Sequence, residues 1–281
     1  MFEMIVATAG AGGVRIEITA DVEGTAYPGQ PINYTFKISG VPVGKKVYWS
    51  MYEDYTAKTI GADRLYDGVT SGVLTITGLP ITVAKRVMGK TLQGRKLVMR
   101  AALTAAEADN PDTALATTPE IVIGKSPTGS ATATTTVPTN VYAMTVSLSG
   151  AGGGGAGGAP SGSFRYYTGG KGGNGVIYSG VVYVKPGTTV SLSKGTGGAG
   201  RPPGQAGYSG GGTSLSGLVL PTTSVSAQGG GGGGIGDNQT GVSGRVGSPN
   251  GSGAAGGAGG ARDQGTGGTG SPGYGTITWG L

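Results

Sequence analysis

Glycine-rich blocks dominate the second half of this sequence and constrain what that half can fold into. Residues 1–125 hold 14 glycines, whereas residues 126–281 hold the other 49 of the 63. A glycine fixed in one conformation loses more backbone freedom than an alanine, at a cost of roughly 0.5–1 kcal/mol. A folded structure built from these blocks must therefore make use of the missing side chains. The abrupt change in composition indicates two different domains.

Several glycine runs repeat every three residues, as in 169–174, 255–261 and 265–270. A polyproline-II helix has three residues per turn, so each run would form a rod with bare faces. Bare faces let neighbouring backbones approach closely enough to exchange N–H to C=O hydrogen bonds. We therefore predict a layer of packed glycine helices. Composition alone favours a disordered low-complexity region equally, but the strands between the runs argue against it.

The first part of the chain shows the alternation of half-buried strands. Apolar and polar residues alternate in 14–19 and 32–38, and 46–51 is expected to form the next strand. Further strands are expected at 72–77, 96–101 and 120–123. Short strands at this spacing predict an immunoglobulin-like β-sandwich over residues 1–124, with Trp49 in its core.

Residues 125–136 contain no large apolar side chain, and we expect them to form a linker. Residues 137–281 are predicted to be a glycine-rich β domain, in which glycine helices or loops are inserted between strands. Those strands are expected at 137–148, 175–184, 187–192, 213–215, 225–227 and 275–279. Trp279 in the last strand is expected to belong to the structural core. The predicted fold class is therefore all-β.

The chain has neither cysteine nor histidine, which excludes disulfides, thiolate or imidazole metal sites and histidine-based catalysis. Paired carboxylates such as Glu53 with Asp54, or Asp63 with Asp67, could support glycan hydrolysis. They fall in predicted loops with no sign of a cleft, so solvated charges are the preferred interpretation. We expect no enzyme activity, no cofactor and no metal.

The net charge of +6 lies mostly after Lys125, where seven basic residues face two acidic ones. This sparse positive charge suits acidic or phosphate-bearing glycans but is too thin for a nucleic-acid surface. A glycine-rich RNA-binding protein is also disfavoured, because Arg-Gly-Gly repeats are missing. We expect no signal peptide and no membrane insertion, since the N-terminus lacks a basic region and no apolar run approaches about 18 residues.

Residues 14–124 resemble the immunoglobulin-like and Calx-beta-like modules of phage tail and fibre proteins. The resemblance rests on Tyr27-Pro28-Gly29-Gln30, Val47-Tyr48-Trp49-Ser50 and the stretch 67–76. Where such modules often carry an acidic calcium-binding segment, this chain has Thr91-Leu92-Gln93-Gly94-Arg95-Lys96. The calcium function therefore does not transfer.

Residues 137–279 are similar to the glycine-rich domain at the ends of many phage tail fibres. A strand ends in Ser149-Gly150-Ala151-Gly152, a hairpin turns at Lys185-Pro186-Gly187, and Gly275-Thr276-Ile277-Thr278-Trp279 closes the chain. The departures from this pattern include Phe164-Arg165-Tyr166-Tyr167 and Arg201-Pro202-Pro203, which decorate the glycine loops.

Together the resemblances imply a non-enzymatic structural protein of a tailed-phage virion, assembled in the host cytoplasm. Its expected place is a tail-fibre or baseplate appendage that binds a receptor on the host surface. The alternative is a capsid or tail decoration protein that stabilises the particle. Expected partners are other virion proteins of the tail, baseplate or capsid, host surface glycans, and further copies of the chain, in a trimer as in many fibres.

Aromatic and basic residues of the glycine loops are the candidates for binding a surface glycan. Tyrosine rings stack on sugars, and arginine or lysine pairs with phosphates and carboxylates. An equally favoured interpretation is that the tyrosines simply pack on the surface. The candidate ligand-binding residues are Arg165, Tyr166, Tyr167, Lys171, Arg201, Tyr208, Arg262 and Tyr274.

Overall fold

The computed structural model describes residues 13–53, 60–62, 65–87, 94–158, 168–235, 251–261 and 265–280. The chain divides into two compact units. The N-terminal unit comprises Met1–Pro127, Asn140–Tyr142 and Gly280–Leu281, and the glycine-rich unit comprises Thr128–Thr139 and Ala143–Trp279. Regular structure in both units is almost entirely β-strand, so the predicted all-β class is confirmed. That the N-terminal unit is immunoglobulin-like stays a prediction.

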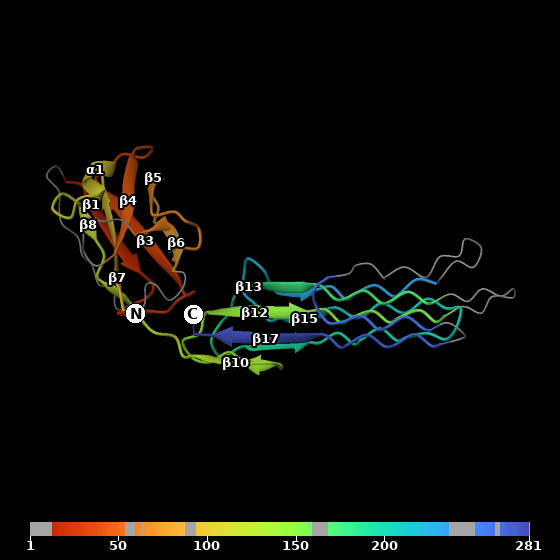
Figure 1. The fold of residues 1–281 in the computed structure, drawn as a ribbon. Coiled ribbons are helices and arrows are strands. Elements are labelled where there is room, and N and C mark those ends of the chain that lie inside the picture. Colours follow the sequence, from red (N-terminus) through yellow and green to blue (C-terminus); the bar gives the residue numbers. More distant parts are fainter. Residues whose placement is uncertain are drawn as a thin grey trace. The chain divides into compact units, whose positions relative to one another are not determined.

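Two sheets in the N-terminal unit share one hydrophobic core (Figure 1). One sheet has the order β1 (Arg15–Ala20), β3 (Pro31–Ser39), β6 (Ile81–Arg86). The other has the order β2 (Thr25–Ala26), β9 (Ile121–Ile123), β7 (Lys96–Ala102), β4 (Lys46–Glu53), β5 (Ser71–Thr75), with β8 (Ala116–Thr117) beside β7. Alternate residues of β3, among them Tyr34 and Phe36, are fully buried in the core, and Trp49 of β4 is only 4% exposed.

Strand β7 is buried along nearly its whole length because both of its faces are covered. One face contributes to the core, and α1 (Ala105–Ala108) packs on β7 and β4. This single helical turn begins with a capping box formed by Thr104 and Glu107. Sequence analysis predicted neither α1 nor β6. One helical turn is too short to show a period, and the fully buried position of β6 holds Lys85 in place of an apolar residue.

The stretch 125–136, expected to be a linker, contains two strands of the glycine-rich unit. β10 (Gly129–Ala131) pairs with β17 (Tyr274–Trp279), and β11 (Thr135–Thr136) pairs with β14 (Thr189–Ser193). A Cβ atom on Gly129 would lie 2.6 Å from Nε1 of Trp279, so the indole ring requires the glycine. Strands without large apolar residues escape a search for hydrophobic alternation, which is why this part was missed.

The glycine-rich unit begins as a small sandwich of two four-stranded sheets. One has the order β10, β17, β12 (Ala143–Ser149), β13 (Ile177–Tyr183), and the other has the order β11, β14, β15 (Thr213–Ser216), β16 (Ser224–Ala227). Val146, Leu148, Leu215 and Ile277 are buried between the sheets. Trp279 ends the inward-facing row of β17 and is only partly buried, so its predicted place in the core is corrected to the margin of the sandwich.

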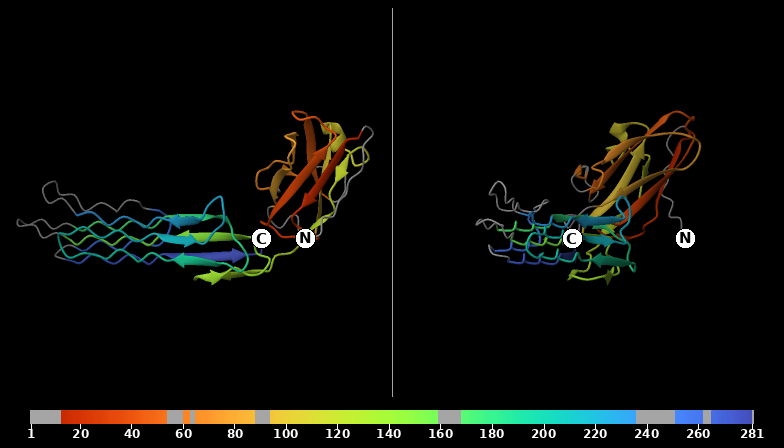
Figure 2. Two further views of the ribbon diagram at one scale, coloured as in Figure 1. Left: turned by 180° about the vertical axis from the view of Figure 1, so that it is seen from behind. Right: turned by 90° about the vertical axis from the view of Figure 1, so that its right-hand side faces the viewer.

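Beyond the sandwich, six strands continue into glycine segments that run side by side (Figures 1 and 2). Segments 150–158, 195–204 and 228–235 follow β12, β14 and β16, and segments 168–176, 205–212 and 265–273 precede β13, β15 and β17. A further segment, 251–261, lies alongside them. We refer to this part of the unit as the glycine bundle.

Segment 150–158 is the centre of the glycine bundle. Every N–H from Gly150 to Gly158 donates a hydrogen bond, and successive residues donate in rotation to three neighbouring segments. Gly153 donates to Gly173 O at 2.9 Å, Gly154 to Tyr208 O at 2.8 Å and Gly155 to Gly268 O at 2.8 Å. Rotation with a period of three is the geometry of an extended helix with three residues per turn.

The outer segments close a ring around this centre, and neighbours in the ring alternate in direction. Each segment antiparallel to the centre donates to the parallel segments on both sides of it. The ring order is 168–176, 228–235, 205–212, 195–204, 265–273, 251–261 and back to 168–176. The predicted packing of glycine helices is therefore confirmed, and it forms a bundle around a buried member rather than a single layer.

Two buried hydroxyl groups join the sandwich to the glycine bundle. The Thr213 hydroxyl donates to Ser149 O at 2.7 Å and accepts from Gly195 N–H at 3.1 Å. The Ser149 hydroxyl accepts from Ala254 N–H at 2.7 Å. Both side chains are fully buried. Their hydrogen bonds satisfy backbone groups at the junction, where neither sheet pairing nor bundle pairing is available.

Glycine is required in the centre because neighbouring backbones occupy the space of a side chain. A Cβ atom on Gly153 would overlap the carbonyl oxygen of Gly231, and one on Gly154 would overlap that of Ala199. We expect Gly153→Ala to destabilise the glycine-rich unit by about 1–3 kcal/mol, since the backbone around it has to shift. Thr269→Ala, at an exposed position of the same bundle, should change stability by less than about 0.5 kcal/mol. Calorimetric unfolding measures both, and equal effects would contradict this packing.

Hydrogen exchange should show the same three-residue period in an outer segment. The N–H groups of Gly172 and Gly173 donate to Gly257 O and Gly231 O, whereas exposed Lys171 has no backbone acceptor among the described residues. We expect Gly172 and Gly173 to be protected and Lys171 to exchange rapidly. Exchange within seconds throughout 168–176 would show that the segment is not part of a stable bundle.

Candidate functional site

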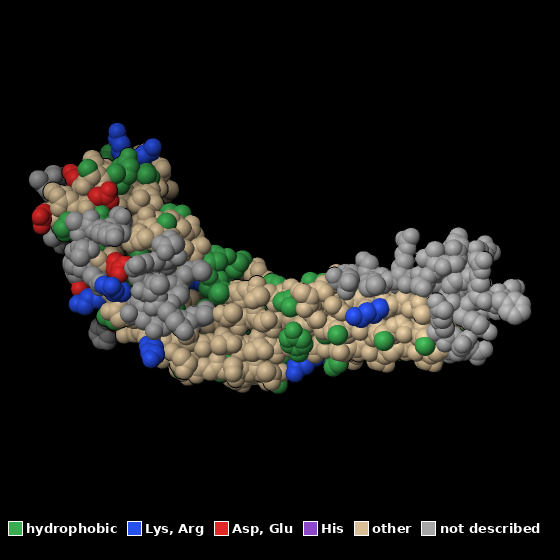
Figure 3. All heavy atoms as spheres, in the orientation of Figure 1, with side chains coloured by type: hydrophobic (Ala, Val, Ile, Leu, Met, Phe, Trp, Pro, Cys, Tyr) green, Lys and Arg blue, Asp and Glu red, His purple; other side chains and the backbone are tan. Residues whose placement is uncertain are grey.

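One residue in three of the outer segments projects from the glycine bundle, and these positions carry its side chains. Thr266 and Thr269 are exposed, whereas Gly267 and Gly270 are buried. The same alternation places Lys171 at the surface of segment 168–176. Figure 3 shows that the visible surface of the bundle is mostly backbone and small polar residues, with few basic or apolar side chains. Sequence analysis did not identify the exposed threonines, although the X-Gly-Gly period, with X facing outward, contains that signal.

Arg201 and Tyr208 are the two predicted site residues that the described structure brings together. They lie on adjacent antiparallel segments, joined by the hydrogen bond from Tyr208 N–H to Ala199 O at 3.1 Å. Arg201 Nη1 donates to the Tyr208 hydroxyl at 2.9 Å, and its Cζ atom lies 4.5 Å from the centre of the tyrosine ring. Tyr208 is nevertheless 54% exposed. The pair is a fixed cation beside an accessible aromatic ring.

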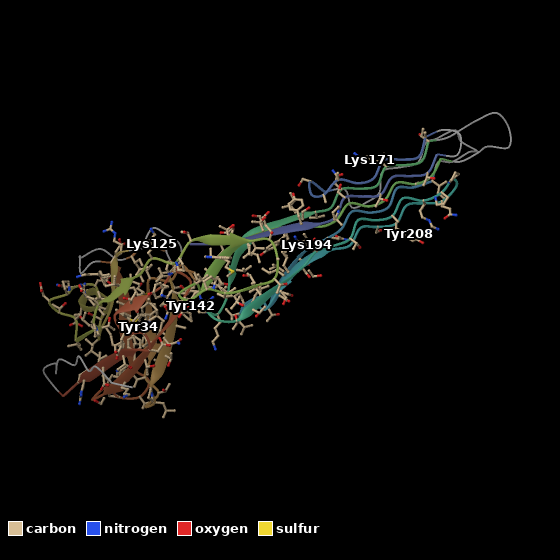
Figure 4. All side chains as sticks on the ribbon, turned by 90° about the horizontal axis from the view of Figure 1, so that it is seen from below. Tyr34, Lys125, Tyr142, Lys171, Lys194 and Tyr208 are labelled. Carbon is tan, nitrogen blue, oxygen red and sulfur yellow. The ribbon has the colours of Figure 1, made fainter. Side chains whose placement is uncertain are left out.

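The other described candidates, Lys171 and Tyr274, do not join this pair. Figure 4 shows Lys171 and Tyr208 on opposite sides of the glycine bundle. Tyr274, which is 50% exposed, opens β17 opposite Ser149, at the sandwich end of the bundle. The remaining predicted residues, Arg165, Tyr166, Tyr167 and Arg262, lie outside the described residues.

Several glycine segments end at the same level, away from the sandwich. Gly158 N–H donates to Gly265 O and Gly204 N–H donates to Gly158 O, while Gly169 and Gly170 bond Gly260 O and Gly234 O. The bundle therefore brings described segment ends from distant parts of the sequence to one level.

Charge differs between the two units. In the N-terminal unit, several lysine and arginine side chains pair with carboxylates, as in Lys96 with Glu120 at 2.8 Å. The described part of the glycine-rich unit contains four cations, Lys171, Lys185, Lys194 and Arg201, and no Asp or Glu. Its charge is therefore uniformly positive over those residues, and its cations remain available to external anions.

The two described carboxylates among those considered for hydrolysis, Glu53 and Asp67, each face a cation. Glu53 lies 3.3 Å from Arg95, and Asp67 lies 2.8 Å from Lys85 Nζ. Lys85 is buried, also donates to Val69 O at 2.9 Å, and lies 4.6 Å from the Trp49 ring centre. Burial tends to raise the pKa of Asp67, but hydrogen bonds from Lys85 and the Val69 backbone, with the lysine charge, lower it overall. Asp54 and Asp63 lie outside the described residues.

A second polar cluster attaches the end of α1 to the neighbouring sheet. Asp109 Oδ1 accepts from the Ser50 hydroxyl at 2.6 Å and from the Tyr52 hydroxyl at 3.0 Å. Arg100 is fully buried, with Cζ 4.1 Å from the Tyr52 ring centre. Burial and then Asp109 raise the pKa of Tyr52 to about 12. The cluster is explained by its role in holding α1 to β4 and β7.

In the portion of the chain that the structure describes, no group of three acidic side chains could hold a metal ion. No described helix is long and apolar enough to cross a membrane. No protein-family model matches the chain, and no curated protein matches it significantly.

The ion pair between buried Lys85 and the exposed carboxylate of Asp67 gives a pH-dependent prediction. We expect Asp67→Asn to destabilise the protein by about 1–3 kcal/mol at pH 7, because it leaves a buried lysine without its carboxylate. The folded-state pKa of Asp67 is lowered, so the pair contributes fully above the unfolded pKa of about 3.9 and is lost as pH falls through the folded value. The difference between the variant and the wild type should therefore shrink in acid.

Urea unfolding at several pH values measures this difference. Glu120→Gln is the matched control, since its partner Lys96 is exposed, unlike Lys85, and their ion pair should contribute less than about 1 kcal/mol. Equal losses for the two variants at pH 7, or a loss for Asp67→Asn that does not change with pH, would contradict the interpretation.

Proposed function

We propose that this chain is a non-enzymatic structural protein of a tailed-phage virion, an appendage component whose glycine-rich unit contacts the host surface. The observation that carries the proposal is the glycine bundle with its segment ends at one level. The sequence resemblance to phage fibre and appendage proteins supports the same assignment. In this proposal the protein is localised in the virion after assembly in the host cytoplasm.

The glycine bundle suits the display of binding residues. Its backbone hydrogen bonds connect every segment to its neighbours, so residues at the segment ends are held on a rigid support. A preordered surface loses less conformational entropy on binding than a flexible one. Connections on a rigid scaffold can also vary in sequence without disturbing it, which is useful for recognising variable receptors.

The N-terminal unit would then attach the chain to other virion proteins of the tail or baseplate. Several of its cations pair with carboxylates within the unit, whereas the described part of the glycine-rich unit offers its cations no carboxylate. This division of charge favours the glycine-rich unit as the part that meets acidic host glycans. A homo-oligomer, including a trimer, is compatible with the proposal.

Adsorption experiments test the proposal with the full chain. Purified protein should compete with phage for cells of the bacterium that the particle infects, and particles lacking the protein should adsorb more slowly. The triple variant Arg165→Ala, Tyr166→Ala, Tyr167→Ala should lose competition, whereas Lys46→Ala in the N-terminal unit should retain it. If the wild-type protein does not compete and deficient particles adsorb normally, host contact is wrong. Reduced particle stability in that case would favour a decoration protein.

A further inference from the structure

We infer that Arg201 and Tyr208 form a binding site for an anionic glycan, a sugar that carries a carboxylate or a phosphate group. This inference rests on the proposed function for its biological setting, because it names the chemistry of the host surface that the glycine-rich unit meets. The site lies on the side of the bundle formed by segments 195–204 and 205–212 (Figure 4).

Arg201 is the first position at which the face of segment 195–204 toward segment 205–212 leaves room for a side chain. At Gly195 and Gly198, six and three residues earlier in the same segment, a Cβ atom would overlap the carbonyl oxygens of Gly211 and Tyr208. The neighbouring segment begins only at Gln205, after a turn closed by the hydrogen bond from Gln205 N–H to Pro202 O at 3.2 Å. A side chain at 201 therefore fits beside the turn, where those at 195 and 198 do not.

The backbone of Arg201 is fixed by neighbours on two sides. Its N–H donates to Gly155 O of the central segment at 3.2 Å, and its carbonyl accepts from Gly267 N–H at 2.9 Å. The contact with Tyr208 then orients the guanidinium group. An arginine held in this way loses less side-chain entropy on binding an anion than a freely rotating one.

The guanidinium group retains most of its donors for a ligand. One nitrogen bonds the Tyr208 hydroxyl, whereas an arginine side chain has five N–H donors. Among the described residues no carboxylate pairs with Arg201, whereas Lys85 and Lys96 of the N-terminal unit each pair with one. Carboxylates and phosphates match the planar donor fork of arginine, so these anions are the expected ligands.

Tyr208 and its surroundings provide the features that select a sugar over a simple anion. More than half of the tyrosine surface is exposed, so the C–H face of a sugar can pack on the ring. Gln205 is exposed at the adjoining turn, and exposed Thr266 precedes Gly267, which bonds the Arg201 backbone. These polar side chains can bond sugar hydroxyls, giving a site with a cation, an aromatic ring and neutral hydrogen-bonding groups.

NMR titration of the full protein tests the site with defined probes. The probes are trigalacturonic acid for a carboxylate, glucose 6-phosphate for a phosphate, and galactotriose as a neutral control. We expect at least one anionic probe to shift the Arg201 and Tyr208 side-chain signals, and the neutral trisaccharide to bind at least tenfold more weakly. The response to each anionic probe distinguishes a carboxylated glycan from a phosphorylated one.

Four variants locate the binding. Arg201→Ala and Tyr208→Ala should each weaken binding of the anionic probe at least tenfold, whereas Tyr208→Phe, which keeps the ring, should weaken it about two- to fivefold. Lys171→Ala, on the opposite side of the bundle, is the charge-matched control and should bind as the wild type does. The inference is overturned if no anionic probe binds, or if Lys171→Ala loses as much affinity as Arg201→Ala.

The adsorption assay separates this inference from the proposed function. One outcome is that the wild-type protein competes with phage and the Arg201→Ala and Tyr208→Ala variants compete equally well. In that case host contact is supported, and the inference that the Arg201–Tyr208 site mediates it is rejected. If the wild-type protein does not compete although the probes bind through Arg201, the proposed function fails while the binding chemistry is retained.

Discussion

Hydrogen bonds between neighbouring glycine backbones are the interaction on which the glycine-rich unit depends. In segment 150–158 every N–H is used by another segment, and the interior of the bundle holds almost no side chains. The buried apolar area that normally offsets the entropy of folding is therefore small there. Close backbone contact, available only where the Cβ atom is missing, takes its place. The glycines are thus the packing elements of this structure.

The small sandwich aligns the glycine segments. Six of the seven described glycine segments are continuous with sandwich strands, so the apolar core between the sheets sets their direction and register before the bundle begins. Buried Ser149 and Thr213 satisfy the backbone where one pattern of hydrogen bonding gives way to the other. A glycine-rich sequence without these strands would have no comparable means of choosing one alignment from many that are alike.

Sequence reasoning identified the strands with apolar alternation and the three-residue period of the glycine runs. It missed β10 and β11, which hold mostly small and hydroxyl side chains, and it placed Trp279 too deeply in the core. The pairing of Arg201 with Tyr208 could not be predicted, because it depends on which segments become neighbours in the ring. The three-residue period predicts which residues of one segment face outward. It does not predict which segments become neighbours, because the glycine faces of all segments are alike.

In the proposed function, the bundle holds the few side chains that would recognise a host surface. The most direct test of the bundle is measurement of NMR scalar couplings across its hydrogen bonds. We predict couplings from the amide nitrogens of Gly153, Gly154 and Gly155 to the carbonyl carbons of Gly173, Tyr208 and Gly268, three different segments for three consecutive residues. Absence of these couplings in the folded protein, or couplings confined to one partner segment, would contradict the account.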